Sequence, residues 1–139
     1  MSRKQTATNE VRPPLPTPSS AEKAAIERAG TRLQTREPRF KVECRQNTKG
    51  VLELLGGAHS DHQGWLDRLQ DLFATRGTDF AVSQLNRLMV ACRESDGKID
   101  NVTLNGLLAM IEGAGPANEI QAALAVQMAL THAAAQSVL

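Results

Sequence analysis

The sequence predicts an all-α fold: a small bundle of about four antiparallel helices, preceded by a disordered leader and one short strand-like segment. Its aromatic residues are only three phenylalanines and one tryptophan, whereas strands favour aromatic and β-branched side chains. From residue 60 onward, apolar residues recur at helical spacing between capping residues and glycines. We therefore divide the chain into a basic leader with a marginal helix (1–38), an extended segment with a short helix (39–57) and a helical bundle (58–139).

The leader is polar and rich in proline. Four of its prolines lie between positions 12 and 18. This density favours extended chain and forbids helix, so we expect residues 1–18 to be a solvated, disordered tail. A Ser-x-x-Glu capping box then predicts a helix over 19–37. Ile26 and Leu33 are the only large apolar residues of that helix, which therefore buries too little to be stable alone.

Residues 39–45 (RFKVECR) alternate apolar and charged side chains. Phe40, Val42 and Cys44 fall on one side, which is the pattern of a half-buried strand. Residues 50–57 (GVLELLGG) predict a short helical turn closed by glycines, so no second convincing strand follows. A lone strand leaves backbone groups unpaired unless another chain supplies an edge. The segment is thus either merely extended or paired with a copy of itself.

Four helices are expected after residue 58. The first three begin at residues able to cap a helix, and connections of a few residues make neighbouring helices antiparallel. The expected spans and caps are 60–77 (Ser60 or Asp61), 78–95 (Thr78 or Asp79), 100–115 (Asp100 or Asn101) and 117–139. The apolar stripes of the first three include Trp65, Leu66, Leu69, Phe73, Leu85, Leu88, Val102, Leu104, Leu108 and Ile111.

The last predicted helix has no charged residue after Glu119. Its length would allow it to span a bilayer. However, alanine adds little hydrophobic drive and buried amides cost free energy without partners, so we expect no membrane span. At helical spacing a wet edge is expected at Gln121, His132 and Gln136, and a buried arc at Ile120, Leu124, Val126, Leu130 and Val138.

Gln127 and Thr131 lie one turn apart inside the predicted buried arc of the last helix. Polar side chains in such an arc need hydrogen-bond partners. They either bond to the backbone and neighbours within the bundle or meet a second chain. The alanines around them would allow another helix to approach closely in either case.

Residues 95–100 (SDGKID) resemble the middle of a calcium-binding loop. Aligning Gly97 on the loop glycine places Cys92 and Thr103 at the first and last ligand positions. Ca²⁺ needs an oxygen ligand at the first position and a bidentate glutamate at the last. We therefore expect a turn at this glycine and a helix cap at Asp100 instead of a calcium site.

Metal and catalytic motifs are weak in this sequence. His59 and His62 have the spacing of a ligand pair, but His132 is the only other histidine. No serine or cysteine accompanies a base in a recognisable arrangement, and no glycine-rich loop carries the lysine of a phosphate site. We expect no enzyme activity, no metal and no cofactor.

The charge is unevenly distributed along the chain. Residues 1–57 carry 11 Lys and Arg against 6 Asp and Glu, whereas residues 58–139 carry 5 against 9. The basic first half is therefore the part able to contact nucleic acid. The two cysteines, Cys44 and Cys92, form neither a disulfide framework nor a zinc pattern, so we expect a cytoplasmic location.

The stretch from LNRLMVAC (85–92) to the alanines after His132 resembles a group of small, uncharacterised proteobacterial helical proteins found among plasmid, phage-like and other accessory genes. The likeness covers residues 80–135. Its corresponding parts are Ile99–Asp100, Leu104–Leu108 and Asn118–His132. No activity is assigned to that group, so the resemblance implies no functional residues here.

These patterns lead to two functional hypotheses. The first is a small cytoplasmic protein–protein interaction or scaffolding protein that forms a homo-oligomer, with no membrane partner. The alternative is a nucleic-acid-associated accessory factor, such as a regulator or a phage packaging-like component, that uses the basic N-terminal half. The candidate interaction surface of the first hypothesis consists of Phe40, Val42, Cys44, Gln127, Thr131 and Val138.

Overall fold

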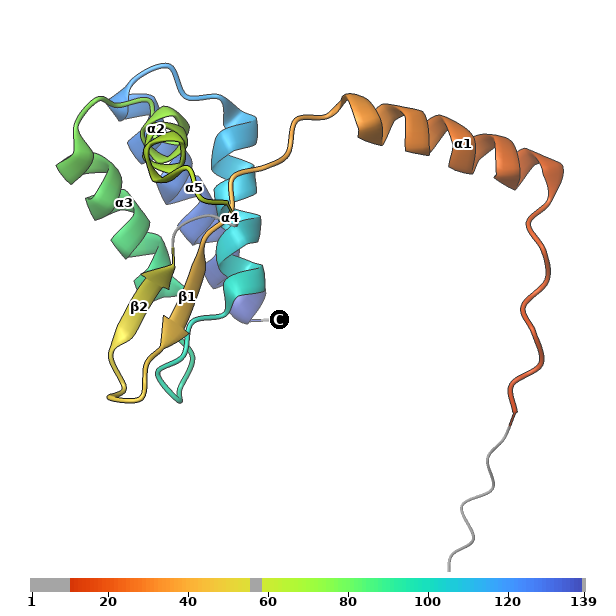
Figure 1. Cartoon of the computed structure of the whole chain (residues 1–139), viewed down its shortest axis with the longest axis horizontal. Coiled ribbons are helices and arrows are strands. Elements are labelled where there is room, and N and C mark those ends of the chain that lie inside the picture. Colours follow the sequence, from red (N-terminus) through yellow and green to blue (C-terminus); the bar gives the residue numbers. More distant parts are fainter. Residues whose placement is uncertain (1–10, 56–58, 139) are drawn as a thin grey trace, which may run out of the picture. The chain divides into compact units, whose positions relative to one another are not determined.

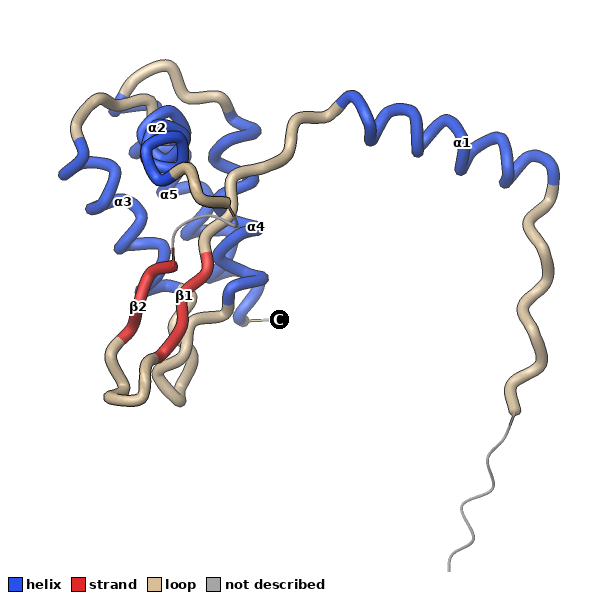
Figure 2. Tube along the Cα trace, in the orientation of Figure 1, coloured by secondary structure: helices blue, strands red, loops and turns tan. Residues whose placement is uncertain are grey.

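The structure, a computed structural model, describes residues 11–55 and 59–138. The chain divides into two compact units, Met1–Glu37 and Pro38–Leu139. The elements are α1 (Ser20–Thr35), β1 (Glu43–Gln46), β2 (Leu52–Leu55), α2 (His62–Leu72), α3 (Thr78–Ala91), α4 (Asn101–Ala114) and α5 (Glu119–Ser137). The mainly helical class is confirmed (Figures 1 and 2). Within the described residues there are five helices, the expected leader helix and four after residue 58, and a two-stranded sheet stands in place of the single strand-like segment.

The first unit contains α1. Its N-cap is Ser19, whose hydroxyl oxygen accepts a hydrogen bond from the Glu22 N–H at 3.2 Å. No residue of this helix is buried, as expected for a segment with so few large apolar side chains. Residues 11–19 have no regular secondary structure, and residues 1–10 of the predicted leader lie outside the described residues.

β1 and β2 form an antiparallel hairpin in which Glu43 lies opposite Leu55 and Arg45 opposite Glu53. The prediction of a short helix over 50–57 is therefore wrong where the structure describes it, because Leu52–Leu55 is a strand, and the last two residues of that span lie outside the described residues. Four residues are too few to form a stable helix alone. Paired with β1, they instead gain a backbone partner from the same chain.

The hairpin loop contains the turn signals that the sequence analysis overlooked. The Asn47 side-chain oxygen accepts hydrogen bonds from the N–H groups of Lys49 and Val51, at 2.9 and 3.0 Å. The Asn47 N–H in turn donates to the Val51 carbonyl oxygen at 2.9 Å. Gly50 closes the turn with φ +75°, a conformation that favours glycine.

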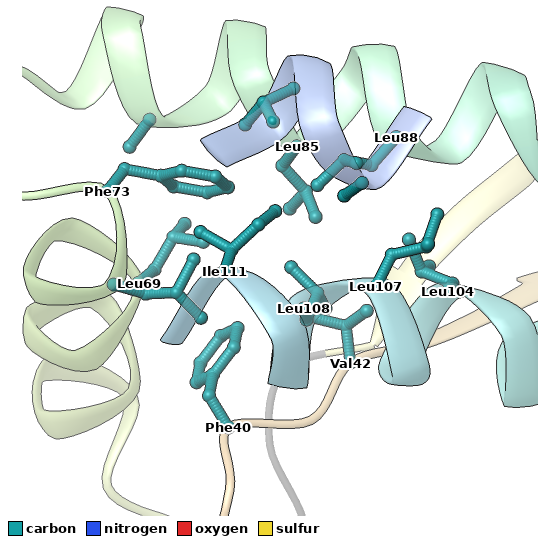
Figure 3. Close-up of a cluster of buried hydrophobic side chains, with 14 of the residues drawn as sticks. Phe40, Val42, Leu69, Phe73, Leu85, Leu88, Leu104, Leu107, Leu108 and Ile111 are labelled. Atoms are coloured by element: carbon teal, nitrogen blue, oxygen red, sulfur yellow. The ribbon is translucent and has the colours of Figure 1, made fainter. Parts of the chain in front are cut away.

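The core of the second unit lies between the inward faces of α2–α5 and the extended segment before β1. Figure 3 shows Phe40 and Val42 of that segment pointing toward Leu69 of α2 and Leu108 of α4. Of the predicted apolar stripes, Trp65, Leu69, Phe73, Leu85, Leu88, Leu104, Leu108 and Ile111 are buried.

Two of the predicted stripe residues, Leu66 and Val102, are exposed instead. Val102 is 85% exposed, because a residue two positions before the buried Leu104 lies about 200° away around the helix. A single apolar residue near a helix start therefore does not extend the buried stripe.

Side-chain caps define most helix starts. The side chains of Asp61, Asp100 and Asn118 accept hydrogen bonds from N–H groups in the first turns of α2, α4 and α5. The expected cap at Thr78 or Asp79 is wrong, because both residues lie inside α3. The N-cap of α3 is Gly77, which has no side chain to form the bond.

The calcium-like loop forms the turn that we expected. Gly97 has φ +85°, and the Asp96 carboxylate accepts a hydrogen bond from the Lys98 N–H at 2.9 Å. The following Ile99 pairs with Arg93 in an isolated antiparallel bridge. The chain thus turns back tightly before α4 begins.

Candidate interaction surfaces

The outer edge of the extended segment is covered by side chains of α4. The Val42 N–H donates to the Asn105 side-chain oxygen at 2.8 Å, and the Asn105 amide nitrogen donates back to the Val42 carbonyl at 3.0 Å. Asn101 forms the same pair of bonds with Cys44, at 2.8 and 3.0 Å. The two asparagines therefore replace a third strand.

The spacing of helix and strand explains this arrangement. Residues four apart on a helix are separated by about 6.0 Å along its axis. Residues two apart on a strand are separated by about 6.6 Å, a nearly equal distance. Asn101 and Asn105 can therefore both meet alternate backbone groups of an extended chain that runs along α4. We call this pair the asparagine ladder.

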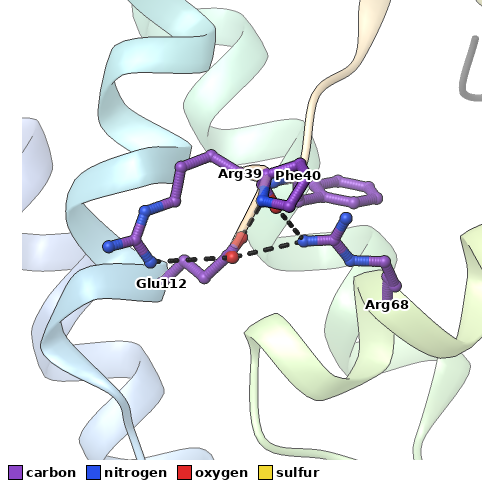
Figure 4. Close-up of polar contacts among 5 residues, drawn as sticks. Arg39, Phe40, Arg68 and Glu112 are labelled. Carbon is purple, nitrogen blue, oxygen red and sulfur yellow. Dashed lines mark hydrogen bonds and ion pairs between the residues drawn. The ribbon is translucent and has the colours of Figure 1, made fainter. Parts of the chain in front are cut away.

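Glu112, two turns beyond Asn105 on the same helix, anchors the start of the segment. Its carboxylate accepts a hydrogen bond from the Phe40 N–H at 3.0 Å (Figure 4). It also forms ion pairs with Arg68 at 3.3 Å and with Arg39 at 3.7 Å. The Arg68 guanidinium donates to the Pro38 carbonyl at 2.8 Å and lies 5.9 Å from the centre of the Phe40 ring. The segment is thus fixed at both ends.

The structure buries three residues of the predicted interaction surface. Phe40, Val42 and Cys44 are only 2, 3 and 5% exposed. Their segment has α4 and β2 of the same chain as its partners, so these side chains face the chain's own core. Burial raises the pKa of the Cys44 thiol. Burial, together with the charges of Asp100 and Cys44, raises that of Cys92 to about 11, so both thiols are weak nucleophiles.

Helix α5 is rotated relative to the orientation that the sequence predicted. Its buried residues are Ala122, Ala125, Val126 and Ala129. The predicted buried arc is correct at Val126 and in part at Leu130, which packs against the core. It is wrong at Ile120, Leu124 and Val138, which are 75, 59 and 86% exposed. Alanine lets helices approach closely, and α5 packs against α3 and α4 through this small-residue face.

The remaining side of α5 is an exposed, uncharged stripe. All of its members are exposed, and three of them are large and apolar. We define this outward face of α5 as Ile120, Leu124, Gln127, Met128, Thr131 and Ala135. Met128 is 66% exposed. Large apolar groups at helical spacing thus face solvent on a helix without charge after Glu119.

The two polar residues singled out on α5 both lie on its outward face. The Thr131 hydroxyl donates to the Gln127 carbonyl of its own helix at 2.8 Å. The Gln127 side-chain amide makes no hydrogen bond within the described part of the chain. Thr131 is thus satisfied locally, whereas Gln127 offers a free donor and a free acceptor to solvent.

The weaker candidate sites remain separate from these surfaces. The His59 ring accepts a hydrogen bond from the Asp61 N–H at 3.2 Å, beside the cap of α2. Residues 11–55 and 59–138 contain no cluster of three His, Cys, Asp or Glu able to hold a metal. Nor is any helix within those residues long and apolar enough to cross a membrane.

The chain matches no protein-family model, no curated protein and no solved structure. The residues that the sequence analysis missed are Asn101, Asn105 and Glu112. The detectable signal for the two asparagines was their spacing of one turn in a largely apolar helix, beside a segment of alternating pattern.

Proposed function

We propose that this protein is a small self-associating protein–protein interaction protein, in which two copies pair through the outward faces of α5. The observation that carries the proposal is the exposure of Ile120, Leu124 and Met128 on a helix with no charge after Glu119. Contiguous exposed apolar side chains mark interaction sites. An uncharged face also does not repel its own copy.

The distribution of side-chain size along the outward face favours an antiparallel pair. Large residues, Ile120 and Leu124, occupy its N-terminal half, and smaller ones, Thr131 and Ala135, its C-terminal half. An antiparallel copy brings the large side chains of one helix against the small ones of the other. A parallel copy would place large against large and leave a gap between the alanines, which packs less well.

Gln127 lies near the middle of the outward face, where a two-fold axis would pass. In an isologous contact, a residue on the axis meets its own copy. A glutamine amide both donates and accepts, so two such groups can bond to each other reciprocally. This contact would supply the hydrogen bonds that the Gln127 side chain lacks within the described residues.

The expected contact area places the dimer at the weak end of stable interfaces. A standard interface buries about 800 Å² per partner. Even a large aromatic side chain supplies only about 150–250 Å², so three aliphatic side chains fall short of this area. The contact must therefore extend along the helix to Gln127, Thr131 and Ala135, and we expect a reversible dimer.

The test is sedimentation or multi-angle light scattering at tens of micromolar protein. The wild type should form dimers that dissociate on dilution, and Leu124→Glu should be monomeric because it buries an unpaired charge in the contact. Val102→Glu is the matched control, since Val102 is exposed on α4 and lies outside the outward face. A strictly monomeric wild type, or equal loss of dimer in both variants, contradicts the proposal.

A second candidate function, contact with nucleic acid, rests on α1. Arg28 and Arg32 lie one turn apart on this helix, of which no residue is buried, with Arg36 at its C-cap. Such a basic row can neutralise phosphates without reading sequence. A gel shift with duplex DNA and with RNA at low salt tests it. Retardation should disappear as salt is raised and in the Arg28→Glu, Arg32→Glu double variant, and its absence at low salt removes this candidate.

A further inference from the structure

The two-stranded sheet has one edge covered and one edge free. Glu43 and Arg45 of β1 pair with Leu55 and Glu53 of β2, and the hydrogen bond from Asn47 to Val51 continues this odd-numbered series. Backbone groups alternate in direction along a strand. The backbone N–H and C=O groups of the even-numbered residues of β1 therefore face the asparagine ladder. Those of the even-numbered residues of β2 face away from β1.

The free edge consists of the N–H and C=O groups of Leu52 and Leu54. Within the described residues, no hydrogen bond from another element reaches them. Figure 1 shows β2 on the outer side of the sheet, with β1 between it and α4. Unpaired backbone groups in such a row are a template for another strand.

A groove of about 550 Å³ lies beside this edge, between β2 and α3. Leu54 forms one wall, and Val82 and Met89 of α3 contribute to the other. Leu54 and Val82 remain 40 and 51% exposed. Leu54 lies opposite Cys44 on the face of the sheet that points to the core. A sheet of two strands is therefore too narrow to cover the apolar side of α3, which continues past the outer edge of β2.

We propose that the free edge of β2 binds an extended peptide of another protein as a third strand. The peptide's backbone pairs with Leu52 and Leu54, and its inward side chains fill the groove under α3. This is strand addition to an exposed sheet edge, in which backbone bonds give affinity and pockets for alternate side chains give specificity. The inward positions should be apolar, because Leu54 and Val82 form their surroundings.

The charge of the groove specifies one further feature of the peptide. Among the described residues that line the groove, Asp79 is the only charged one. A basic side chain at one inward end of the peptide would pair with it. A second copy of β2 fits less well, because it would bring another Glu53 and another Asp79 to an edge that already carries both, and like charges on facing strands repel.

The test uses a synthetic probe, acetyl-Lys-Thr-Val-Thr-Val-Thr-amide, whose lysine and valines share one face. The monomeric Leu124→Glu variant serves as receptor, so that failure of this proposal is distinguishable from failure of dimerisation through α5. Amide chemical shifts are followed by NMR during titration. The lysine probe should shift the amides of Leu52 and Leu54 and those of the facing turns of α3. A probe with glutamate in place of lysine should bind about twofold to fivefold more weakly.

Two variants of the receptor sharpen the test. Leu54→Pro removes an outward N–H but none of the hydrogen bonds to β1, and edge strands tolerate proline at such positions. The substitution should weaken binding of the probe about threefold to tenfold. Asp79→Lys should reverse the preference, so that the glutamate probe binds more tightly. This reversal stays interpretable even if the proline variant fails to fold.

Three results would overturn the proposal. The first is no shift at Leu52 and Leu54 with saturating probe. The second is the same preference for lysine in the Asp79→Lys variant. The third is a concentration-dependent shift of these amides without any probe, which would show that the edge pairs with its own copy.

Discussion

Helices α4 and α5 share one core but use their side chains in opposite ways. α4 buries its large residues Leu104, Leu108 and Ile111 completely, and its polar side binds the extended segment through the asparagine ladder. α5 buries small residues and exposes Leu124 and Met128. The polar side chains of α4 are satisfied within the chain, whereas the large apolar side chains on the outward face of α5 stay exposed, which is why we propose that a second copy covers them. Apolar content alone therefore does not tell which face of a helix is buried.

The largest expected effect compares the same substitution on the two helices. Leu108→Ala removes a fully buried side chain and should lower the free energy of unfolding by about 2–5 kcal/mol. Leu124→Ala should change it by no more than about 0.5 kcal/mol. Urea unfolding at high dilution, where self-association does not contribute, measures both. Equal losses of unfolding free energy in the two variants would mean that Leu124 is buried within its own chain.

The next comparison concerns polar residues. Asn105→Ala leaves the N–H and C=O of Val42 unpaired in a half-buried site, which should cost about 2–4 kcal/mol of unfolding free energy. Gln127→Ala should leave unfolding at high dilution unchanged and weaken self-association. Asn86→Ala is the matched control, because Asn86 has the same place in LNRLM (85–89) as Asn105 has in LNGLL (104–108), but is exposed.

If Asn86→Ala lowered the free energy of unfolding as much as Asn105→Ala does, the hydrogen bonds of the asparagine ladder would add no stability of their own. The two asparagines look alike in sequence, since each follows a leucine inside a helix. The structure separates them, because only Asn105 faces an extended chain. Local sequence similarity thus did not predict equivalent positions here.

The parts of the fold that sequence predicted well depend on local rules. The helix caps at Asp61 and Asp100 and the turn at Gly97 follow from hydrogen bonds within a few residues. The alternation over 39–45 likewise predicted which side chains face inward. Only the partner of that segment was undetermined, because pairing with β2 and with α4 joins residues that are distant in sequence.

The rotation of α5 was not predictable from apolar periodicity. A prediction based on side-chain hydrophobicity assigns Ile120 and Leu124 to the core and gives the alanines little weight. Close packing against α3 and α4 instead selects a face made mostly of alanines, namely Ala122, Ala125 and Ala129. The groove beside β2 was also not predictable, since it depends on a strand that the sequence analysis interpreted as helical.

The third comparison enlarges a small residue on each face of α5. Ala122→Leu overpacks a fully buried position and should cost about 1–3 kcal/mol of unfolding free energy. Ala135→Leu adds the same atoms to the exposed face and should leave thermal unfolding at high dilution nearly unchanged. If both were neutral, α5 would not pack by its alanines. Because Ala135 belongs to the outward face, its enlargement should also alter the dimer's dissociation constant.

The smallest effect concerns the start of α4, where Asp100 caps the helix that carries the asparagine ladder. The hydrogen bond from the Thr103 hydroxyl, followed by those from the N–H groups of Thr103 and Val102, lowers the pKa of Asp100 below its ordinary value of 3.8. The folded state therefore holds this carboxylate ionised where the unfolded state protonates it. Its stabilisation is complete above the unfolded pKa and is lost as pH falls through the folded one.

Asp100→Asn keeps a capping oxygen but removes the titration. The wild type should unfold at a higher temperature than this variant near neutral pH, and the difference should shrink as pH falls below about 4. Thr103→Val removes the largest cause of the lowered pKa and should flatten the same acid dependence. Calorimetry at several pH values measures both. If the difference in unfolding temperature between wild type and Asp100→Asn were instead the same at every pH, the Asp100 cap would stabilise α4 by its hydrogen-bond geometry and not by its charge. Protonation would then not affect the helix that carries the asparagine ladder.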